Sequence, residues 1–184
     1  MKRELGVMPA VFPMPVLMVG TYDEDGTVDV MNAAWGQICG MDKITLCLTE
    51  SHKTVKNLKK TGAFTVALAD AAHIKEADFF GIASGNSDSE KFRKSGLTAV
   101  KSEKVNAPII EEFPVVMECE LIECGTYGVV GRIVGVSADE AVLDENGKID
   151  VEKAGIVLFD QFKAGYYAIG EKVGQAWNAG KALM

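Results

Sequence analysis

Five residues able to bind an anion stand close together in the first third of the chain. They are Thr49, Ser51, His52, Lys53 and Thr54. The apolar and basic residues that follow predict an amphipathic helix over 55–61. Because the start of a helix exposes unpaired backbone N–H groups and the positive end of the peptide dipoles, it suits an anion. With hydroxyl groups and a lysine in the same segment, the sequence predicts a phosphate-binding site.

A purely structural interpretation of the same residues also exists. Ser and Thr are among the preferred N-cap residues, so Ser51 or Thr54 alone would indicate only where a helix starts. In this segment three hydroxyl groups, a lysine and a histidine come together in six positions. This convergence favours ligand binding over capping.

The segments before the helix predict how the site is positioned. We expect a strand over 16–22, a turn over 23–26, a strand over 27–32, a small-residue turn over 33–40 and a strand over 43–48. Three successive strands without an intervening helix indicate a barrel or sandwich and not a βαβ unit. Asn32 then lies one strand before the helix start, beside the small-residue turn.

The remaining elements are assigned in the same way. We expect an irregular arm over 1–12, an interior strand over 63–69, a helix over 71–81, a connecting loop, a helical turn over 90–94, strands over 98–102, 115–124 and 129–138, a turn over 144–147, an apolar segment over 154–159 and a helix-like tail over 166–183. The pattern is therefore mainly β with peripheral helices, in a single domain over 1–184.

Several types of reactive site lack support in this sequence. His52 and His73 are the only histidines, no serine lies in a nucleophile elbow, and a Cys–His pair has no local signature. Neither HExxH, GxGxxG before a helix, nor GxxxxGK[ST] occurs. Chemistry would therefore belong to a bound cofactor, with no catalytic side chain.

Composition narrows the partners and the location. The 26 acidic residues outnumber the 19 basic ones, which are dispersed, and this balance disfavours nucleic acid. The apolar runs are too short to span a membrane, and Glu4 and nearby prolines interrupt any leader-like start, so we expect a cytoplasmic protein. The four cysteines lack the spacing of a metal site and are predicted to be buried free thiols.

Four segments, taken in order and spacing, resemble those of a known family. They are PMPVLMVGTYDEDGTVDVMNAAWG, ESHKTVKNLKKTGAFTV, ASGNSDSEKF and YYAIGEKVGQAWNAGK. They resemble the flavin reductase-like proteins with an FMN-binding split barrel, in particular the flavoredoxin-like branch, and the resemblance extends over almost the whole chain. The resemblance implies a Greek-key split barrel, a homodimer and one FMN per subunit near the dimer interface.

The resemblance also implies which residues contact the cofactor. A first group passes along the isoalloxazine ring: Asn32, Ala33, Ala34 and Trp35. A second group faces the phosphate and ribityl chain: Thr49, Ser51, His52, Lys53 and Thr54. Further contacts are implied for Ser84, Gly85 and Lys91. Trp35 either stacks on the flavin or packs in the core or a dimer interface.

One departure bears on the source of electrons. Many relatives carry a histidine in the strand that here reads GTYGVVGRIV, and this chain has Tyr127 in that place. The resemblance as a whole implies an FMN protein that carries electrons or hydride to a small acceptor or redox partner. Its donor is either NAD(P)H or a reduced redox protein, and the missing histidine favours the second. The alternative is a non-redox split-barrel module that binds haem or a phosphate compound.

Overall fold

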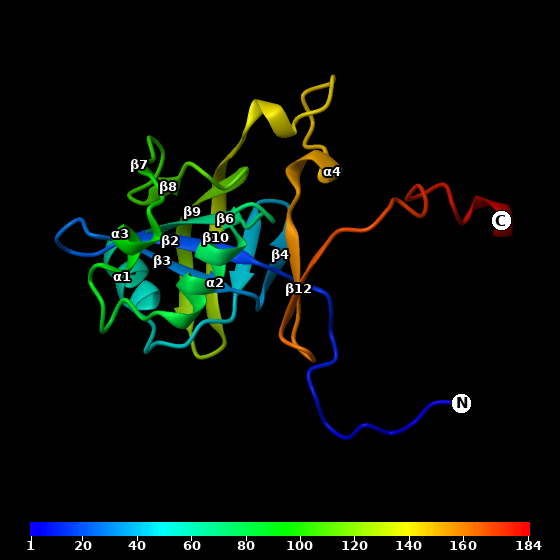
Figure 1. The fold of residues 1–184 in the computed structure, drawn as a ribbon, viewed down its shortest axis with the longest axis horizontal. Coiled ribbons are helices and arrows are strands. Elements are labelled where there is room, and N and C mark those ends of the chain that lie inside the picture. The colour runs from blue at the N-terminus through cyan, green and yellow to red at the C-terminus, as the bar shows by residue number, and fades with distance from the viewer.

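The computed structural model describes residues 1–184 except the side chain of Ala182. Its body is a curled antiparallel sheet of seven strands in the order β3-β2-β6-β9-β10-β5-β4 (Figure 1). These strands are β2 (Leu17–Tyr22), β3 (Val28–Ala33), β4 (Gly36–Gly40), β5 (Lys43–Leu46), β6 (Ala63–Leu68), β9 (Val115–Gly125) and β10 (Gly128–Ala138). The predicted mainly β split-barrel class is confirmed.

The curl of the sheet follows from one short connection. The edge strands β3 and β4 stand at opposite ends of the strand order, yet only Ala34 and Trp35 separate them in the chain. The sheet must therefore curl until its two edges approach each other. The small-residue turn predicted over 33–40 is correspondingly too long, since β4 already begins at Gly36.

Strands β2 and β6 bury both of their faces, which explains their nearly continuous apolar sequence. In β2, Leu17 and Val19 belong to one core cluster, whereas Met18 belongs to another, as expected for side chains that alternate between the faces of a strand. Helix α1 (Lys53–Thr61) adds Val55 and Leu58 to the first cluster. The start of α1 is thereby fixed against the barrel.

Helices α2 (Ile74–Ile82) and α3 (Lys91–Ser95) cover the other face of the sheet. Ala77 and Phe80 of α2 are fully buried in the second cluster, and Phe80 stacks on Phe92 of α3 with ring centroids 6.2 Å apart. The end of α2 and the start of α3 therefore lie beside β3, facing the start of α1.

The remaining elements surround this body. A small sheet contains β1 (Met14–Pro15), β11 (Val157–Asp160) and β12 (Gly165–Ala168), and a second contains β7 (Ala99–Lys101) and β8 (Pro108–Ile110). Helix α4 spans Val151–Ala154, and 3₁₀ turns span Glu140–Val142 and Lys181–Leu183. No helix in the described part of the chain has the length and apolar character needed to cross a membrane.

Two sequence-based expectations about the ends and the cysteines are wrong. The tail over 166–183 is not a helix: it begins with β12 and continues mostly without regular structure. Its glycines disfavour a helix, and it extends away from the body, so it has no surface to pack against (Figure 1).

Cys119 is buried, but Cys39 and Cys47 are exposed, because they lie on or beside the sheet edge formed by β4.

Candidate functional site

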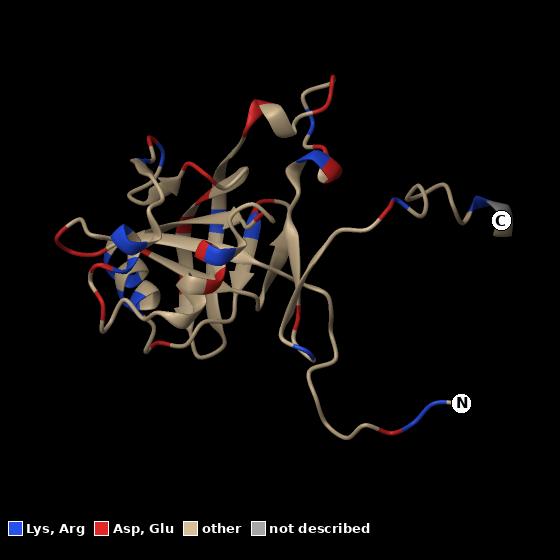
Figure 2. Ribbon diagram, in the orientation of Figure 1, with Lys and Arg blue, Asp and Glu red and all other residues tan. Residues whose placement is uncertain are grey.

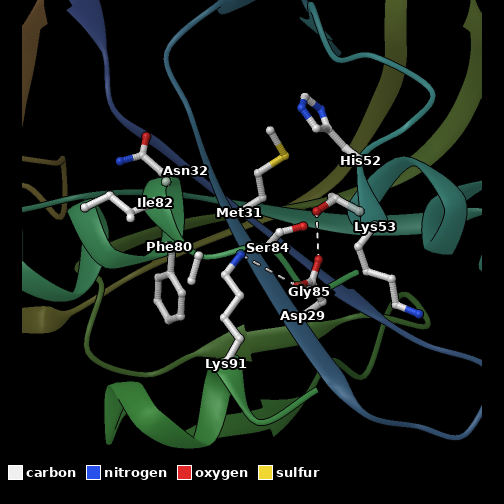
Figure 3. Close-up of a pocket in the computed structure, with 13 residues that line it drawn as sticks. Asp29, Met31, Asn32, His52, Lys53, Phe80, Ile82, Ser84, Gly85 and Lys91 are labelled. Atoms are coloured by element: carbon white, nitrogen blue, oxygen red, sulfur yellow. Dashed lines mark hydrogen bonds and ion pairs between the residues drawn. The ribbon is translucent and has the colours of Figure 1, made fainter. Parts of the chain in front are cut away.

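A cavity of about 210 Å³ lies where the start of α1, strand β3, the end of α2 and the start of α3 meet (Figure 3). Its lining includes seven of the twelve residues implied by the sequence: Asn32, His52, Lys53, Thr54, Ser84, Gly85 and Lys91. The fold thus brings together residues that are up to 59 positions apart, from Asn32 to Lys91.

The start of α1 is not closed by a side chain. His52 is the residue before the first helical position, and its side chain makes no capping hydrogen bond. The hydroxyl of Thr54 donates instead to a carboxylate oxygen of Asp29, at 2.9 Å. In the described structure, therefore, no side-chain hydroxyl caps this helix. Its first backbone N–H groups stay available for a ligand.

Asp29 organises the centre of the cavity. Its carboxylate accepts from Thr54 on one oxygen and lies 3.8 Å from the ammonium nitrogen of Lys91 through the other. Asp29, Thr54 and Lys91 are all buried. Figure 3 shows Asp29 on β3 and Lys91 on α3 pointing toward each other, and the bond from Thr54 to Asp29 connects this pair to the start of α1.

Lys91 carries a buried cation without a full set of partners. Among the described residues, its ammonium group is within hydrogen-bond distance of no acceptor; Asp29 is at 3.8 Å, and the ring of Phe80 lies 5.7 Å away. Burial lowers the pKa of this ammonium, and Asp29 opposes the shift. A buried ammonium has three donors to satisfy, so this geometry suits an anionic acceptor in the cavity.

Lys53 is directed elsewhere. Its amino group pairs with Asp23, and this hydrogen bond holds the pKa of the Asp23 carboxyl below its usual value. In Figure 3 the Lys53 side chain points away from the ammonium of Lys91. The remaining lysines of α1 are also bonded, to Asn86 (Lys56), Glu50 (Lys59) and Glu24 (Lys60). The basic face predicted for this helix is therefore largely neutralised by neighbouring side chains (Figure 2).

The loop after α2 is attached to the start of α1. Asn86 donates from its side chain to the backbone oxygen of Ser51, at 2.9 Å, and accepts from Lys56 at 2.6 Å. Within the same loop, a Cβ added at Gly85 would lie 2.3 Å from an oxygen of Asp29. Only glycine allows this close approach, so the segment interpreted as a connector from its polar sequence forms a wall of the cavity.

The turn between β3 and β4 extends the site. The side chain of Asn32 donates to the backbone oxygen of Ala77, at 2.9 Å, which orients the amide at the cavity wall. Ala34 lines a neighbouring cavity of about 320 Å³ together with Asn32. Ala33 is buried, and Trp35 is 53% exposed in a separate, largely apolar cavity of about 400 Å³ beside the N-terminal arm.

The other two implied residues lie at the rim. Thr49 and Ser51 are exposed and bond to each other through their hydroxyls at 3.0 Å, and neither lines the 210 Å³ cavity. Sequence reasoning also missed residues that do line it: Asp29, Met31, Phe80, Gly81, Ile82 and Ala83. A signal existed for Asp29, which is a charged residue between two valines of β3.

Comparison with known proteins assigns the chain to a family. The family model described as the flavin reductase like domain matches residues 8–163. The chain belongs to the flavin reductase-like domain family. The family assignment therefore covers every element that lines the cavity, from β3 to α3.

Two solved flavin reductase-like structures resemble this chain along nearly its whole length. Flavoredoxin of Desulfovibrio vulgaris (Miyazaki F) is 37% identical, with a TM-score of 0.94, and the alignment covers 98% of this chain and 100% of that one. Flavoredoxin from Methanosarcina acetivorans is 24% identical, with a TM-score of 0.88, and the alignment covers 100% of both chains. The second likeness supports the fold alone.

A curated relative matches over a shorter range. An uncharacterised protein of Aeropyrum pernix is 30% identical over 112 residues, which is 59% of this chain and 43% of that protein. This chain therefore spans less than half of that relative's length.

Proposed function

We propose that this protein binds FMN in the cavity at the start of α1 and carries electrons or hydride through it to a small acceptor or redox partner. The flavin reductase-like family and its flavoredoxin relative support FMN as the cofactor. The observation that carries the proposal is the buried Lys91, which lines the same cavity as the start of α1 and whose ammonium lacks an acceptor within hydrogen-bond distance among the described residues.

The donor set fits a single phosphate group. The free N–H groups at the start of α1 and the cation of Lys91 are both suited to phosphate oxygens. Gly81 and Gly85 also line this cavity between the helix start and Asn32, and neither adds a side chain to it. The chain would hold the phosphate at the helix start and the ring near the turn from Asn32 to Trp35.

The protein's own residues bind and orient, and none is assigned as a nucleophile. When bound, FMN supplies the capacity to accept and release a hydride or single electrons. Lys91 would neutralise the phosphate, and Thr54 and Asp29 would hold Lys91 in place. The amide of Asn32, fixed by its bond to Ala77, would face the ring.

The test is an absorbance spectrum of the purified protein before and after FMN is added and excess flavin is removed by desalting. We expect retained flavin bands, followed by bleaching when a competent donor is added without oxygen. NADH, NADPH and a reduced redox protein are compared as donors. A colourless protein that also fails to turn over added FMN would overturn the proposal and favour a module for another ligand.

Tyr127 supports a redox protein as the donor. Its side chain is 93% exposed in the tight turn between β9 and β10, and it lines neither the 210 Å³ cavity nor its 320 Å³ neighbour. Tyrosine lacks the imidazole that the resemblance implies for this strand. We expect faster reduction by a reduced redox protein than by NADH or NADPH.

The affinity for FMN should fall as the pH rises above neutrality toward 10.5, the ordinary pKa of a lysine. The phosphate is fully ionised above about pH 7 because its second pKa is about 6. Burial lowers the pKa of Lys91 from its ordinary value of 10.5, so its charge is lost earlier than in the unfolded chain. The carboxylates of Asp29 and Asp88 face this group, and the hydrogen bond from Lys94 holds the pKa of the Asp88 carboxyl below its usual value. Fluorescence titration at several pH values measures the affinity.

Stability should change in the opposite direction over this range. Between the lowered pKa of Lys91 and 10.5, the unfolded chain binds more protons than the folded one, so the contribution of this group to the free energy of unfolding rises with pH. A Lys91→Met variant should lack both trends. An equal pH dependence of FMN affinity in that variant would contradict the assignment.

We also propose a homodimer, with the cofactor site near the subunit interface. The N-terminal arm and the C-terminal tail extend away from the body and carry exposed apolar side chains, including Val7, Val173 and Trp177 (Figure 1). A second copy of the chain would cover them. Light scattering after size exclusion should give twice the 19.7 kDa of one chain.

The dimer is tested by charge substitutions in the tail. Replacing Val173 and Trp177 with aspartate should shift the mass toward one chain, because burying the new carboxylates in an apolar contact is unfavourable. Val151→Asp, at an exposed apolar position on α4, is the matched control and should leave the mass unchanged. A single-chain mass for the unmodified protein would refute the dimer.

A further inference from the structure

The largely apolar cavity of about 400 Å³ opens beside the hairpin from which the C-terminal tail leaves the body. Its lining consists of arm residues between Pro9 and Pro15, the segment from Ala34 to Gln37, and Thr45, Cys47 and Gln161. None of the lining residues that the structure describes is charged. The volume is sufficient for a bicyclic aromatic group, and walls of this kind favour an apolar occupant.

The C-terminal tail is a segment whose apolar side chains have nothing to cover. It begins after Ala168, the last residue of β12, and extends away from the body (Figure 1). Trp177 is 94% exposed, and Val173 and Leu183 are exposed to a similar degree. Burying such groups removes apolar surface from water, so the tail is suited to contact another apolar surface.

The positions of the tail and the cavity favour a reciprocal exchange between two copies of the chain. Gln161 lies in the turn that joins β11 to β12, and the tail continues from β12, so one hairpin connects the two. Trp177 follows Ala168 by nine positions (177 − 168), which an extended backbone spans over up to ~30 Å. A two-fold axis beside this hairpin would place each tail over the cavity of the other copy.

We propose that Trp177 of each copy inserts into the 400 Å³ cavity of the other copy. The indole would pack against Trp35 and the prolines of the arm, since aromatic pairs are stabilised in offset or edge-to-face contact. The inference rests on the homodimer proposed above and adds what its tails bind. Ala34 lines both this cavity and the 320 Å³ cavity, so the exchanged tail would close the outer side of the turn that we place near the flavin ring.

Disulfide trapping in the full-length chain tests this exchange. Cys47 is exposed and lines the cavity, whereas Cys39 is exposed but does not line it. Ala176→Cys and Asn178→Cys each add a thiol beside the indole without removing the indole. We expect mild oxidation to join two chains in at least one of these variants, because a disulfide needs its two Cα atoms within about 7 Å. The product should have twice the mass of 19.7 kDa on a denaturing gel without reductant.

The natural cysteines and one strand supply the matched controls. Adding Cys47→Ser should abolish the cross-link, and adding Cys39→Ser should leave its yield unchanged. Thr45→Phe fills part of the cavity and should lower the yield at least fivefold. Lys43→Phe adds the same ring on the same strand, outside the cavity lining, and should leave the yield unchanged.

Fluorescence provides a second measurement that needs no added thiol. Trp35 and Trp177 are the two tryptophans of the chain, so Trp35→Phe leaves Trp177 as the reporter and keeps an aromatic wall. In the flavin-free protein, we expect acrylamide to quench Trp177 at least threefold less than in the same variant unfolded in urea. Equal quenching in the folded and unfolded protein would overturn the proposal.

The exchange and the homodimer fail in different ways. A cross-link within one chain would mean that the tail covers its own cavity, and a cross-link that survives Cys47→Ser would place the indole elsewhere. Either result refutes the exchange. A two-chain mass without a cross-link in either thiol variant keeps the homodimer and refutes the exchange alone. A single-chain mass refutes both, and FMN binding is then still decided by its own absorbance test.

Discussion

Replacing Lys91 with methionine is expected to lower the affinity for FMN about ten- to a hundredfold. A hydrogen bond to a charged group contributes about 1.5–3 kcal/mol, and tenfold in affinity corresponds to about 1.4 kcal/mol. The ammonium of Lys91 is buried and has no acceptor within hydrogen-bond distance among the described residues, so its interaction with a phosphate would be little screened by water. Fluorescence titration of FMN at pH 7 measures the loss.

The variant must be separated from simple unfolding. Removing Lys91 leaves the buried carboxylate of Asp29 with Thr54 as its hydrogen-bond partner, and breaking a buried ion pair can cost several kcal/mol. The double variant Asp29→Asn, Lys91→Met removes both charges. It should recover much of the free energy of unfolding, measured with urea, without recovering the affinity for FMN.

A second lysine on α3 provides the control. Lys94 is half exposed and pairs with Asp88 at 2.6 Å, outside the cavity lining, so Lys94→Met should change FMN affinity less than twofold. If Lys91→Met binds FMN normally while Lys53→Met does not, the phosphate lies at Lys53, as the sequence alone implied. That result would refute the role proposed for Lys91.

The fold was predictable where local patterns decide it. The hairpin at Asp25-Gly26 joins β2 and β3, and Gly62 ends α1 in the left-handed conformation, with φ of +69°, as its position after the helix predicts. The buried faces of β2 and β6 also follow from their apolar sequences. These features depend on neighbours in the chain, which periodicity and turn chemistry describe.

The details of the site depend on distant contacts and were harder to predict. From the sequence, Lys53 is the evident cation at the helix start, but Asp23, 30 positions earlier, binds its amino group. Lys91 follows a polar loop whose composition suggests only a connection, yet packing of Phe80 against Phe92 brings the lysine into the cavity. Similarly, apolar residues over 166–183 suggested a helix, but the tail has no surface on its own body to pack against.

Replacing Gly85 with alanine is the second substitution with a large expected effect. A Cβ at this position would lie 2.3 Å from an oxygen of Asp29 and 3.1 Å from Cγ of Lys53. Asp29 cannot withdraw freely because it is buried and holds Thr54 at 2.9 Å. We expect the free energy of unfolding to fall by about 1–3 kcal/mol, as for other overpacked sites. We expect FMN affinity to fall at least tenfold, because displacing Asp29 would also displace the ammonium of Lys91, which lies 3.8 Å from its carboxylate.

The cause of this loss can be tested with a double-mutant cycle. If the clash with Asp29 is responsible, Gly85→Ala should cost much less stability in an Asp29→Ala background, and the two substitutions should be strongly non-additive. Gly170→Ala adds the same methyl group where no atom lies within 4 Å and should change neither stability nor FMN affinity. Additive effects of Gly85→Ala and Asp29→Ala would mean that the glycine acts through loop flexibility and not through space. In that case the loop would not hold Asp29, Thr54 and Lys91 in place around the phosphate. The FMN affinity lost in Gly85→Ala would then come from a changed backbone conformation of the loop and not from displacement of Asp29.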